Sequence, residues 1–475
     1  MVGISSYGAY IPYLRMPLGA ISGGGKGGDG PSPEKAVASW DEDALTMAVA
    51  AATACLKGIE RSAIDGVLFA STSYAFKEKQ GAAIIAKALD LRRDVLTADL
   101  GDSLRAGTNA LRAAADAIQA GSAKRILVAI GDVRIAAPRS ALEVNLGDAG
   151  AAFLLAADGV AAGLGASHNV SDEIIDVWRT EGDRFVHAWE DRFIVDHGYR
   201  QNMREVVKGL LGKTKLTAKD ITRAVFYGPD ARSHAALGRE LGFNPTEQVQ
   251  DPLFGRVGNA GAALTPLLLI AALEQARAGD RILVAGYGDG ADAFIFEVGA
   301  EIDKLRDRRG VKWHLERRGE LASYDKYMRM RSFIAAEHDR RGGAGISATI
   351  HFRERDQDIS LLGLRCRKCG TTQYPAQRVC FTCYAKDDFE KVRLSDKIGR
   401  LLSFTFDNFA GSPDPPLVAT MTEIEGAHLY IQMTDANPKE VKLDLPVELV
   451  FRKIHEAGGT PNYFWKVTPA RELVK

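Results

Sequence analysis

Four of the chain's five cysteines form two Cys-x-x-Cys pairs separated by ten residues: Cys366, Cys369, Cys380 and Cys383. Two such pairs in series can supply the four thiolates of a tetrahedral zinc site. Four protein ligands leave no open coordination position, so this zinc is expected to be structural. Nearby Arg367 and Lys368 would favour the thiolate form. A pair of redox dithiols is the alternative, but a single metal ion accounts better for both pairs.

Two other local patterns are weaker. The fifth cysteine, Cys55, lies in an alanine-rich stretch expected to be a helix, where a thiol behaves as a small hydrophobic side chain. The glycine-rich segment 23–28 surrounds Lys26, but Gly27 occupies the position where a phosphate-binding loop needs Ser or Thr. We therefore expect a mobile loop there.

Length and charge limit the class of protein. A chain of 475 residues predicts more than one domain, and 61 basic against 61 acidic residues argue against nucleic-acid binding. The N-terminal sequence does not resemble a secretory signal, and the apolar runs are shorter than the roughly 20 residues that cross a bilayer. We expect a cytoplasmic protein with no membrane segment.

An internal repeat indicates which helices and strands would position a functional site. Helical and β-rich stretches alternate over the first 300 residues, which indicates a layered α/β fold. The sequence Arg-Ile-Leu-Val-Ala occurs at 125–129 and again at 281–285, each time followed by a Gly-Asp turn and an apolar strand. Two similar halves, 1–165 and 166–300, are predicted.

The remainder of the chain changes character twice. Residues 301–346 carry dense mixed charge and are expected to be a helical connector. The cysteine pairs place a zinc ribbon at 347–395. Short alternating strands separated by turns then predict a small β-barrel at 396–475.

Several motifs also carry a family resemblance. They are Asp41–Ala48, Asp99–Leu100, Arg105–Thr108, Gly258–Asn259, Gly279–Leu283, Tyr287–Gly290 and Tyr324–Tyr327. With these motifs, residues 1 to 335 resemble the archaeal and bacterial hydroxymethylglutaryl-CoA synthases of the thiolase superfamily. The resemblance implies a duplicated thiolase fold, layered α/β/α/β/α, and a coenzyme A thioester as substrate. We also expect a homodimer.

Residues 347–475 resemble a second family, in which a rubredoxin-like zinc ribbon precedes an oligonucleotide/oligosaccharide-binding (OB) barrel. Members of that family associate with thiolases and help to hold coenzyme A. A partner thiolase is therefore implied as well.

The synthases use a glutamate, a cysteine that carries the acyl group, and a histidine. Aligning the motifs puts Thr72, Leu104 and Tyr227 at those three positions. Leucine cannot form an acyl thioester, so the resemblance predicts related chemistry without a covalent intermediate rather than true hydroxymethylglutaryl-CoA synthase activity.

Four residues remain as catalytic candidates: Tyr227, Asn259, His197 and Ser103. The Tyr227 phenol could exchange a proton with an enolate or alkoxide, or it could simply pack at a strand end. Asn259 matches a family asparagine that polarises the thioester carbonyl, with a turn role as its alternative. His197, like His187, could act as a base or lie in a solvated loop. Ser103 would need a neighbouring base to be a nucleophile.

These residues predict an acyl-CoA-dependent enzyme that makes or breaks a carbon–carbon bond by Claisen or aldol chemistry, or by the reverse reaction. The alternative is a non-catalytic scaffold that binds coenzyme A and partner thiolases through the zinc-ribbon barrel.

Overall fold

Both copies of the repeat are strands of one sheet in the computed structural model, which describes residues 1–22, 32–334, 347–457 and 460–471. The first copy opens β6 (Arg125–Val133) and the second opens β12 (Arg281–Tyr287). Each pairs antiparallel with the strand that follows it, β7 (Asp148–Ala156) or β13 (Gly290–Val298).

The two repeated strands, β6 and β12, also have equivalent parallel neighbours in the sheet. β6 pairs in parallel with β4 (Gly66–Ala70), and β12 with β11 (Arg223–Phe226). The halves join where β1 (Gly3–Tyr10) pairs with β8 (Ala162–Ser171), giving the nine-stranded order β11-β12-β13-β8-β1-β7-β6-β4-β5. The predicted duplication is confirmed.

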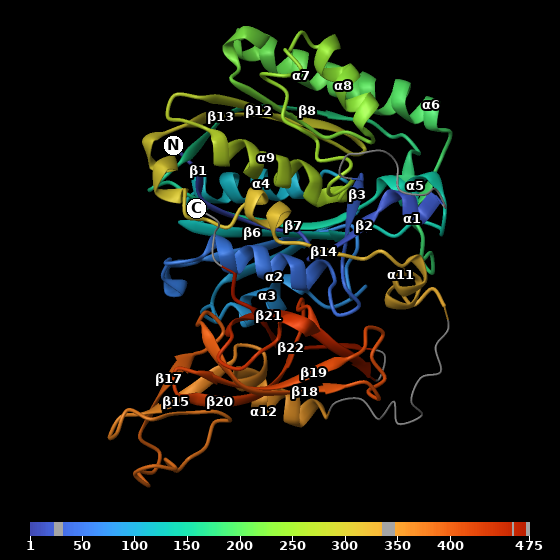
Figure 1. Ribbon diagram of the computed structural model, residues 1–475. Helices are drawn as coiled ribbons and strands as arrows, with labels where there is room; N and C mark the ends of the chain where they lie inside the picture. The colour runs from blue at the N-terminus through green and yellow to red at the C-terminus, as the bar shows by residue number, and fades with distance from the viewer. Residues whose placement is uncertain (23–31, 335–346, 458–459, 472–475) are drawn as a thin grey trace. The chain divides into compact units, whose positions relative to one another are not determined.

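Helices fill and cover this sheet in layers (Figure 1). The central layer holds α4 (Ala106–Gln119) and α9 (Leu264–Gln275), and α9 is apolar on nearly all sides because both of its faces are covered. α2 (Ala44–Cys55) packs outside one part of the sheet, and α7 (Gln201–Thr214) with α8 (Ala231–Glu240) lies outside the other. The α/β/α/β/α layering is as expected.

The chain forms two compact units. The first unit comprises Met1–Ala38, Asp43–Ile85 and Arg92–Ala322. The second unit comprises Ser39–Glu42, Ala86–Leu91 and Ser323–Lys475.

The charged segment expected at 301–346 contains short elements where it is described. They are η5 (Ala300–Leu305), α10 (Val311–Glu316), β14 (Gly319–Glu320) and α11 (Tyr324–Met330). Its residues 335–346, and the whole of the glycine-rich segment at 23–28, lie outside the described residues.

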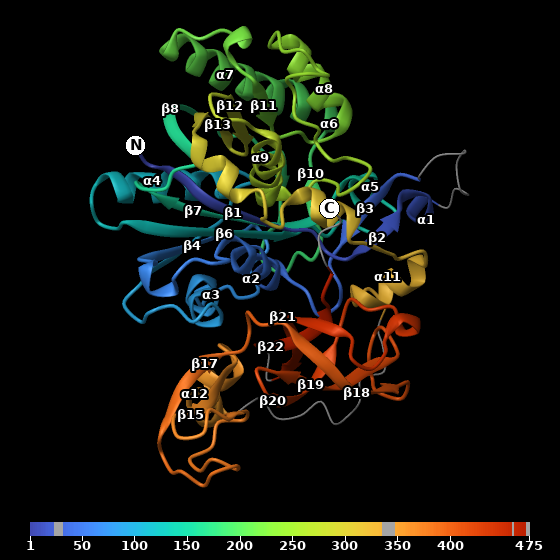
Figure 2. The same cartoon turned by 60° about the vertical axis from the view of Figure 1, so that its left-hand side comes forward.

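The second unit holds a zinc-ribbon sheet and a closed barrel (Figure 2). The sheet has the order β16-β15-β17, and α12 (Ala348–Asp358) precedes it. Its strands are β15 (Leu362–Cys366), β16 (Thr372–Gln373) and β17 (Phe389–Arg393). The barrel order is β18-β19-β20-β22-β21. Its strands are β18 (Gly399–Asp407), β19 (Leu417–Ile424), β20 (Ala427–Met433), β21 (Pro446–Ala457) and β22 (Thr460–Pro469).

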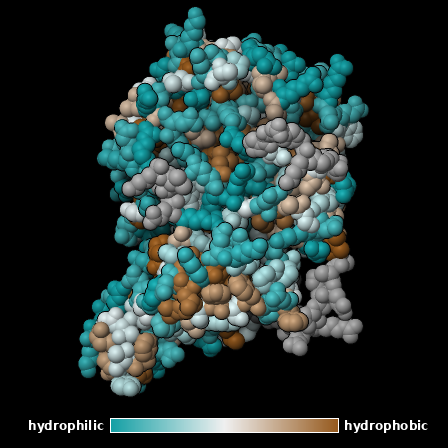
Figure 3. Space-filling model, in the orientation of Figure 1, coloured by the Kyte–Doolittle hydropathy of each residue, from teal (hydrophilic) through white to brown (hydrophobic). Residues whose placement is uncertain are grey.

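Side chains such as Leu401, Phe451 and Trp465 are buried in the second unit. Other apolar side chains remain exposed there, including Ile350, Phe352 and Phe409, and Figure 3 shows hydrophobic residues gathered on the surface of this unit. No helix within the described ranges is long and apolar enough to span a bilayer.

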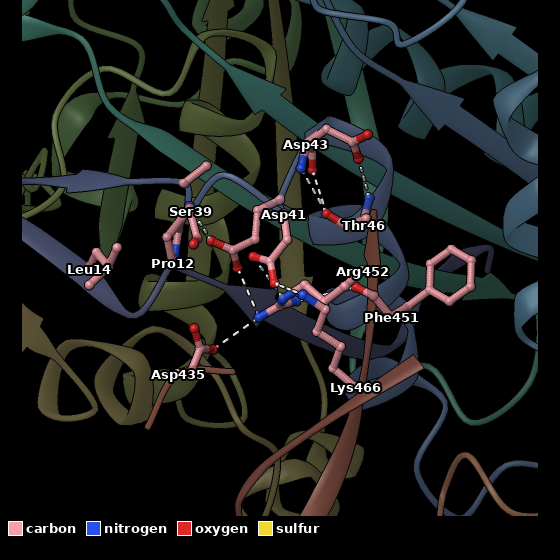
Figure 4. Close-up of polar contacts among 12 residues, drawn as sticks. Pro12, Leu14, Ser39, Asp41, Asp43, Thr46, Asp435, Phe451, Arg452 and Lys466 are labelled. Carbon is pink, nitrogen blue, oxygen red and sulfur yellow. Dashed lines mark hydrogen bonds and ion pairs between the residues drawn. The ribbon is translucent and has the colours of Figure 1, made fainter. Parts of the chain in front are cut away.

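A buried ion cluster explains why Ser39–Glu42 groups with the barrel (Figure 4). Arg452 on β21 contacts Glu42 at 3.1 Å and Asp435 at 3.0 Å through Nη2. Lys466 on β22 contacts Asp41 at 2.9 Å. All five side chains are almost completely buried, so each charge depends on the others for its stability.

Candidate functional site

The four cysteine sulfurs of the second unit lie together, all within 4.8 Å of one another. The closest approaches are 3.6 Å between Cys366 and Cys383 and 3.5 Å between Cys369 and Cys380. A tetrahedron of Zn–S bonds of about 2.3 Å places its sulfurs about 3.8 Å apart, so the cluster fits zinc. All four coordination positions would be filled by protein, which suits a structural site.

In the first unit, Tyr227 and Asn259 form a direct hydrogen bond. Tyr227 follows the last residue of β11, and its backbone N–H donates to Ala285 O at 2.9 Å. Asn259 Oδ1 accepts the Gly261 N–H at 2.9 Å, which turns Nδ2 toward Tyr227 Oη at 2.8 Å. Because Oη accepts this bond, the phenolic proton is free to be donated elsewhere.

Two further tyrosines surround this pair. The Tyr227 ring lies 5.8 Å from that of Tyr287 and 6.4 Å from that of Tyr199, whose hydroxyl donates to Tyr227 O at 2.8 Å. Among the described residues, the buried Tyr287 hydroxyl and Asp176 Oδ2 have no aligned hydrogen-bond partner. The two groups nevertheless lie close enough to affect each other's pKa, and burial raises the pKa of both.

The protonation of Tyr227 is set by its surroundings. Burial raises the pKa of Tyr227 to about 12, although the Asn259 hydrogen bond and then the charge of Arg134 act to lower it. Tyr227 is therefore a neutral hydrogen-bond donor near neutral pH.

Asp132, on β6, holds the turn that follows Asn259. It accepts hydrogen bonds from Thr72 Oγ1 at 2.8 Å, from Ser73 Oγ at 2.5 Å and from the Ala262 N–H at 2.9 Å. Gly261 has a φ of +55°, and a Cβ there would collide with the Asp132 carboxylate, so only glycine fits. Asp132 thereby fixes the turn that carries Asn259.

The other predicted residues lie apart from this pair. Ser103 Oγ accepts a 3.5 Å bond from the Arg105 N–H, and no histidine or carboxylate in the described residues bonds to it. Leu104 is buried in the hydrophobic core. His197 is exposed and its ring lies 5.1 Å from Phe193.

His187 and Cys55 also lie outside the site formed by Tyr227 and Asn259. His187 is exposed beside Asp183, at 3.3 Å. Cys55 is fully buried in α2, as expected for a packing role.

The sequence interpretation missed Asp132, Arg134, Asp176 and Tyr287. One signal could have revealed two of them: Asp132 and Tyr287 lie near the carboxyl ends of the two repeated strands, and equivalent strand ends in a duplicated sheet are brought to comparable positions. Asp176 and Arg134 carry no local motif.

Comparison with known proteins agrees with this architecture. The family model of the 3-oxoacyl-[acyl-carrier-protein] synthase III C-terminal domain matches residues 211–296, and that of the ChsH2 rubredoxin-like zinc ribbon domain matches residues 353–390. A solved structure of HMG-CoA synthase complexed with CoA has a TM-score of 0.63 at 19% identity, covering 73% of this chain and 94% of that one. A solved structure of the 3-oxoacyl-(acyl carrier protein) synthase III, FabH, of Pseudomonas aeruginosa has a TM-score of 0.56 at 21% identity, and the match covers 63% of this chain and 98% of that one.

The fold and these matches define a thiolase-superfamily α/β protein with a C-terminal zinc ribbon. Among curated proteins, the hydroxymethylglutaryl-CoA synthase of Methanothermobacter thermautotrophicus is 33% identical over 320 residues, which are 65% of this chain and 91% of that protein. The synthase of Methanocaldococcus jannaschii is 31% identical over 345 residues, which are 70% of this chain and 99% of that protein. The chain belongs to the hydroxymethylglutaryl-CoA synthase family.

Proposed function

We propose that the protein is an acyl-CoA-dependent enzyme that forms or cleaves a carbon–carbon bond beside the thioester carbonyl. The observation that carries the proposal is the 2.8 Å hydrogen bond from Asn259 to Tyr227, which aims a buried phenolic proton away from Asn259. Such a proton can be donated to the oxygen on which charge develops during Claisen, aldol or reverse reactions. The relatives named as HMG-CoA synthases support a coenzyme A thioester as the substrate.

The reaction is proposed to proceed without an acyl-enzyme. The motif alignment that supports this proposal has Leu104 at the position of the synthases' acylated cysteine, and an alkyl side chain cannot be acylated. Ser103 has no bonded base among the described residues, which disfavours it as a substitute nucleophile.

A base is still needed, and Asp176 is well suited to the role. Its pKa is raised by burial, and it faces the Tyr287 hydroxyl beside Tyr227. A carboxylate of raised pKa is a stronger base toward a carbon acid than an exposed aspartate. Asp176 would take the proton, directly or through Tyr287, while Tyr227, oriented by Asn259, donates its hydrogen bond to the oxygen.

The test is turnover of a panel of β-ketoacyl- and β-hydroxyacyl-CoAs, with acetyl-CoA and free CoA, by the full chain. Tyr227→Phe keeps the ring and removes the proton, and is expected to lower kcat by about 10²- to 10⁴-fold. Tyr384→Phe, exposed in the zinc ribbon, is the matched control. Intact-mass measurement during turnover should detect no acyl adduct. No turnover by the wild type, or full activity of Tyr227→Phe, would refute the proposal.

A second candidate function, a scaffold that binds coenzyme A and a partner thiolase, is favoured by one feature of the second unit. A cavity of about 390 Å³ opens there, with Ile350 and His351 of α12 and Tyr430, Tyr463 and Trp465 of the barrel in its lining. A scaffold would bind CoA equally well after Tyr227→Phe and would turn over none of the panel. Either function is compatible with a homodimer.

A further inference from the structure

Arg134 is a buried cation without a counter-ion. It follows the last residue of β6 and is only 7% exposed. Its guanidinium makes one hydrogen bond, from Nη1 to Thr72 Oγ1 at 3.0 Å, and Nε has no partner. Within the described residues, no carboxylate lies within 4.0 Å of it. Buried arginines are nearly always paired, because an isolated charge in a protein interior is strongly destabilising.

A second cation lies beside it. Arg179 donates from Nη2 to the Thr72 backbone carbonyl, and it too makes no ion pair with any described carboxylate. Burial lowers the pKa of Arg179, and the charge of Arg134 lowers it further. Two guanidinium groups on one threonine repel each other, so a bound anion near them would stabilise this arrangement.

The neighbouring carboxylates in the described residues form no ion pair with either arginine. Asp132 lies nearby, but its oxygens already accept bonds from Thr72, Ser73 and Ala262. Asp148 binds the backbone N–H of Arg134, at 2.9 Å, rather than the guanidinium. Asp183 also acts on Arg179, but its Oδ2 already accepts two hydrogen bonds from Thr180, both at 2.6 Å.

Arg134 also belongs spatially to the Tyr227 site. Its Cδ would lie 2.9 Å from a Cβ on Gly261, two residues after Asn259. Of the charged groups that act on the Tyr227 phenol, which include Asp132 and Asp176, Arg134 has the largest effect. The charge of Arg134 therefore lies close enough to the Tyr227 phenol to act on it.

We propose that Arg134, supported by Arg179, forms an oxyanion subsite beside Tyr227 that binds the enolate oxygen of an acyl-CoA thioester. The proposal rests on the proposed function. When the α-proton passes to Asp176, the electron pair of the broken C–H bond forms the C=C bond of the enolate and the carbonyl π pair moves onto the thioester oxygen, whose charge Arg134 neutralises. When the α-carbon attacks a carbonyl, that charge passes to the new alkoxide, which takes the proton back. No oxidant or reductant is needed.

The subsite can be tested by binding, without turnover. Carboxymethyl-CoA carries a carboxylate where the thioester enolate would lie, whereas acetonyl-CoA is a neutral ketone of similar shape. Dissociation constants for both are measured by calorimetry on the full-length wild type and on Arg134→Met, Arg134→Lys and Arg134→Gln. Arg192→Met, the same substitution at a side chain that is 97% exposed, is the control.

We expect Arg134→Met to raise the dissociation constant of carboxymethyl-CoA by about 30-fold or more, and that of acetonyl-CoA by less than about 3-fold. Arg134→Lys should retain most of the preference for the anion, and Arg192→Met all of it. If Arg134→Met does not unfold cooperatively, the comparison of Arg134→Lys with Arg134→Gln gives the same test.

If Arg134→Met weakens the binding of both ligands equally, Arg134 only supports the fold. If it changes the binding of neither, Arg134 contacts neither ligand. Either result overturns the proposed subsite. In both cases the wild type would still bind acetonyl-CoA and turn over the thioester panel, so the proposed function would stand. A wild type that binds neither analogue and turns over no thioester would overturn both.

Discussion

Replacing Arg452 by methionine tests the buried ion cluster of the second unit. Arg452 holds Glu42 at 3.1 Å and Asp435 at 3.0 Å, and its side chain is fully buried. At an effective dielectric constant of 20, each contact contributes about 5 kcal/mol of attraction, which is largely offset by the desolvation of the charges. Removing one member leaves the others buried and less well paired, which costs about 3–5 kcal/mol.

The assay is urea unfolding of the full chain, followed by tryptophan fluorescence and by zinc release to a chromogenic chelator. The zinc signal reports the second unit, because the cysteine cluster lies there. Arg400→Met is the control: Arg400 also contacts two carboxylates, Glu423 at 2.9 Å and Asp444 at 2.7 Å, but its side chain is 53% exposed. The control should therefore lose no more than about 1 kcal/mol.

A compensating variant separates lost pairing from lost packing. Adding Glu42→Gln and Asp435→Asn to Arg452→Met removes the carboxylates that face the missing cation, and should recover a large part of the stability. The reasoning is refuted if Arg452→Met unfolds within about 0.5 kcal/mol of the wild type, or if the triple variant is no more stable than the single one.

Two further predictions concern the metal and pH. Cys380→Ser should abolish stoichiometric zinc, measured by plasma mass spectrometry, whereas Cys55→Ser should keep it; zinc retained by Cys380→Ser would contradict the site. Burial raises the pKa of Asp292, which accepts a 2.7 Å bond from Thr108, to about 7. The folded state then holds this proton more tightly than the unfolded chain, so stability should fall as pH rises from about 4 to about 7. Asp292→Asn should flatten this part of the profile of thermal unfolding against pH, and an unchanged slope would show that Asp292 does not titrate there.

The features that the sequence predicted are those encoded by local spacing. Cys366 and Cys369 are close because a short turn joins them, and the repeated strands are recognisable because each carries its own apolar pattern. Tyr227 and Asn259 could be named only through the family motif, since nothing in their flanking residues predicts their 2.8 Å contact.

The features that were missed depend on contacts between distant segments. Arg134 and Arg179 meet at Thr72 only after β4 and β6 have paired, and no short motif describes an unpaired charge. His197 was named from the family segment around it; its side chain is exposed, and its catalytic role stays a prediction. The assignment of Ser39–Glu42 to the barrel unit depends on charges at the other end of the chain.

That last pairing has a consequence for biosynthesis. Asp41 and Lys466 are 425 residues apart, so at 5–20 residues per second the ribosome adds the lysine about 20 to 85 s after the aspartate. Throughout this interval the carboxylates of Asp41 and Glu42 remain hydrated, because their cationic partners on β21 and β22 have not yet been made. The second unit must therefore complete its folding around a segment that left the ribosome long before β21 and β22 were synthesised.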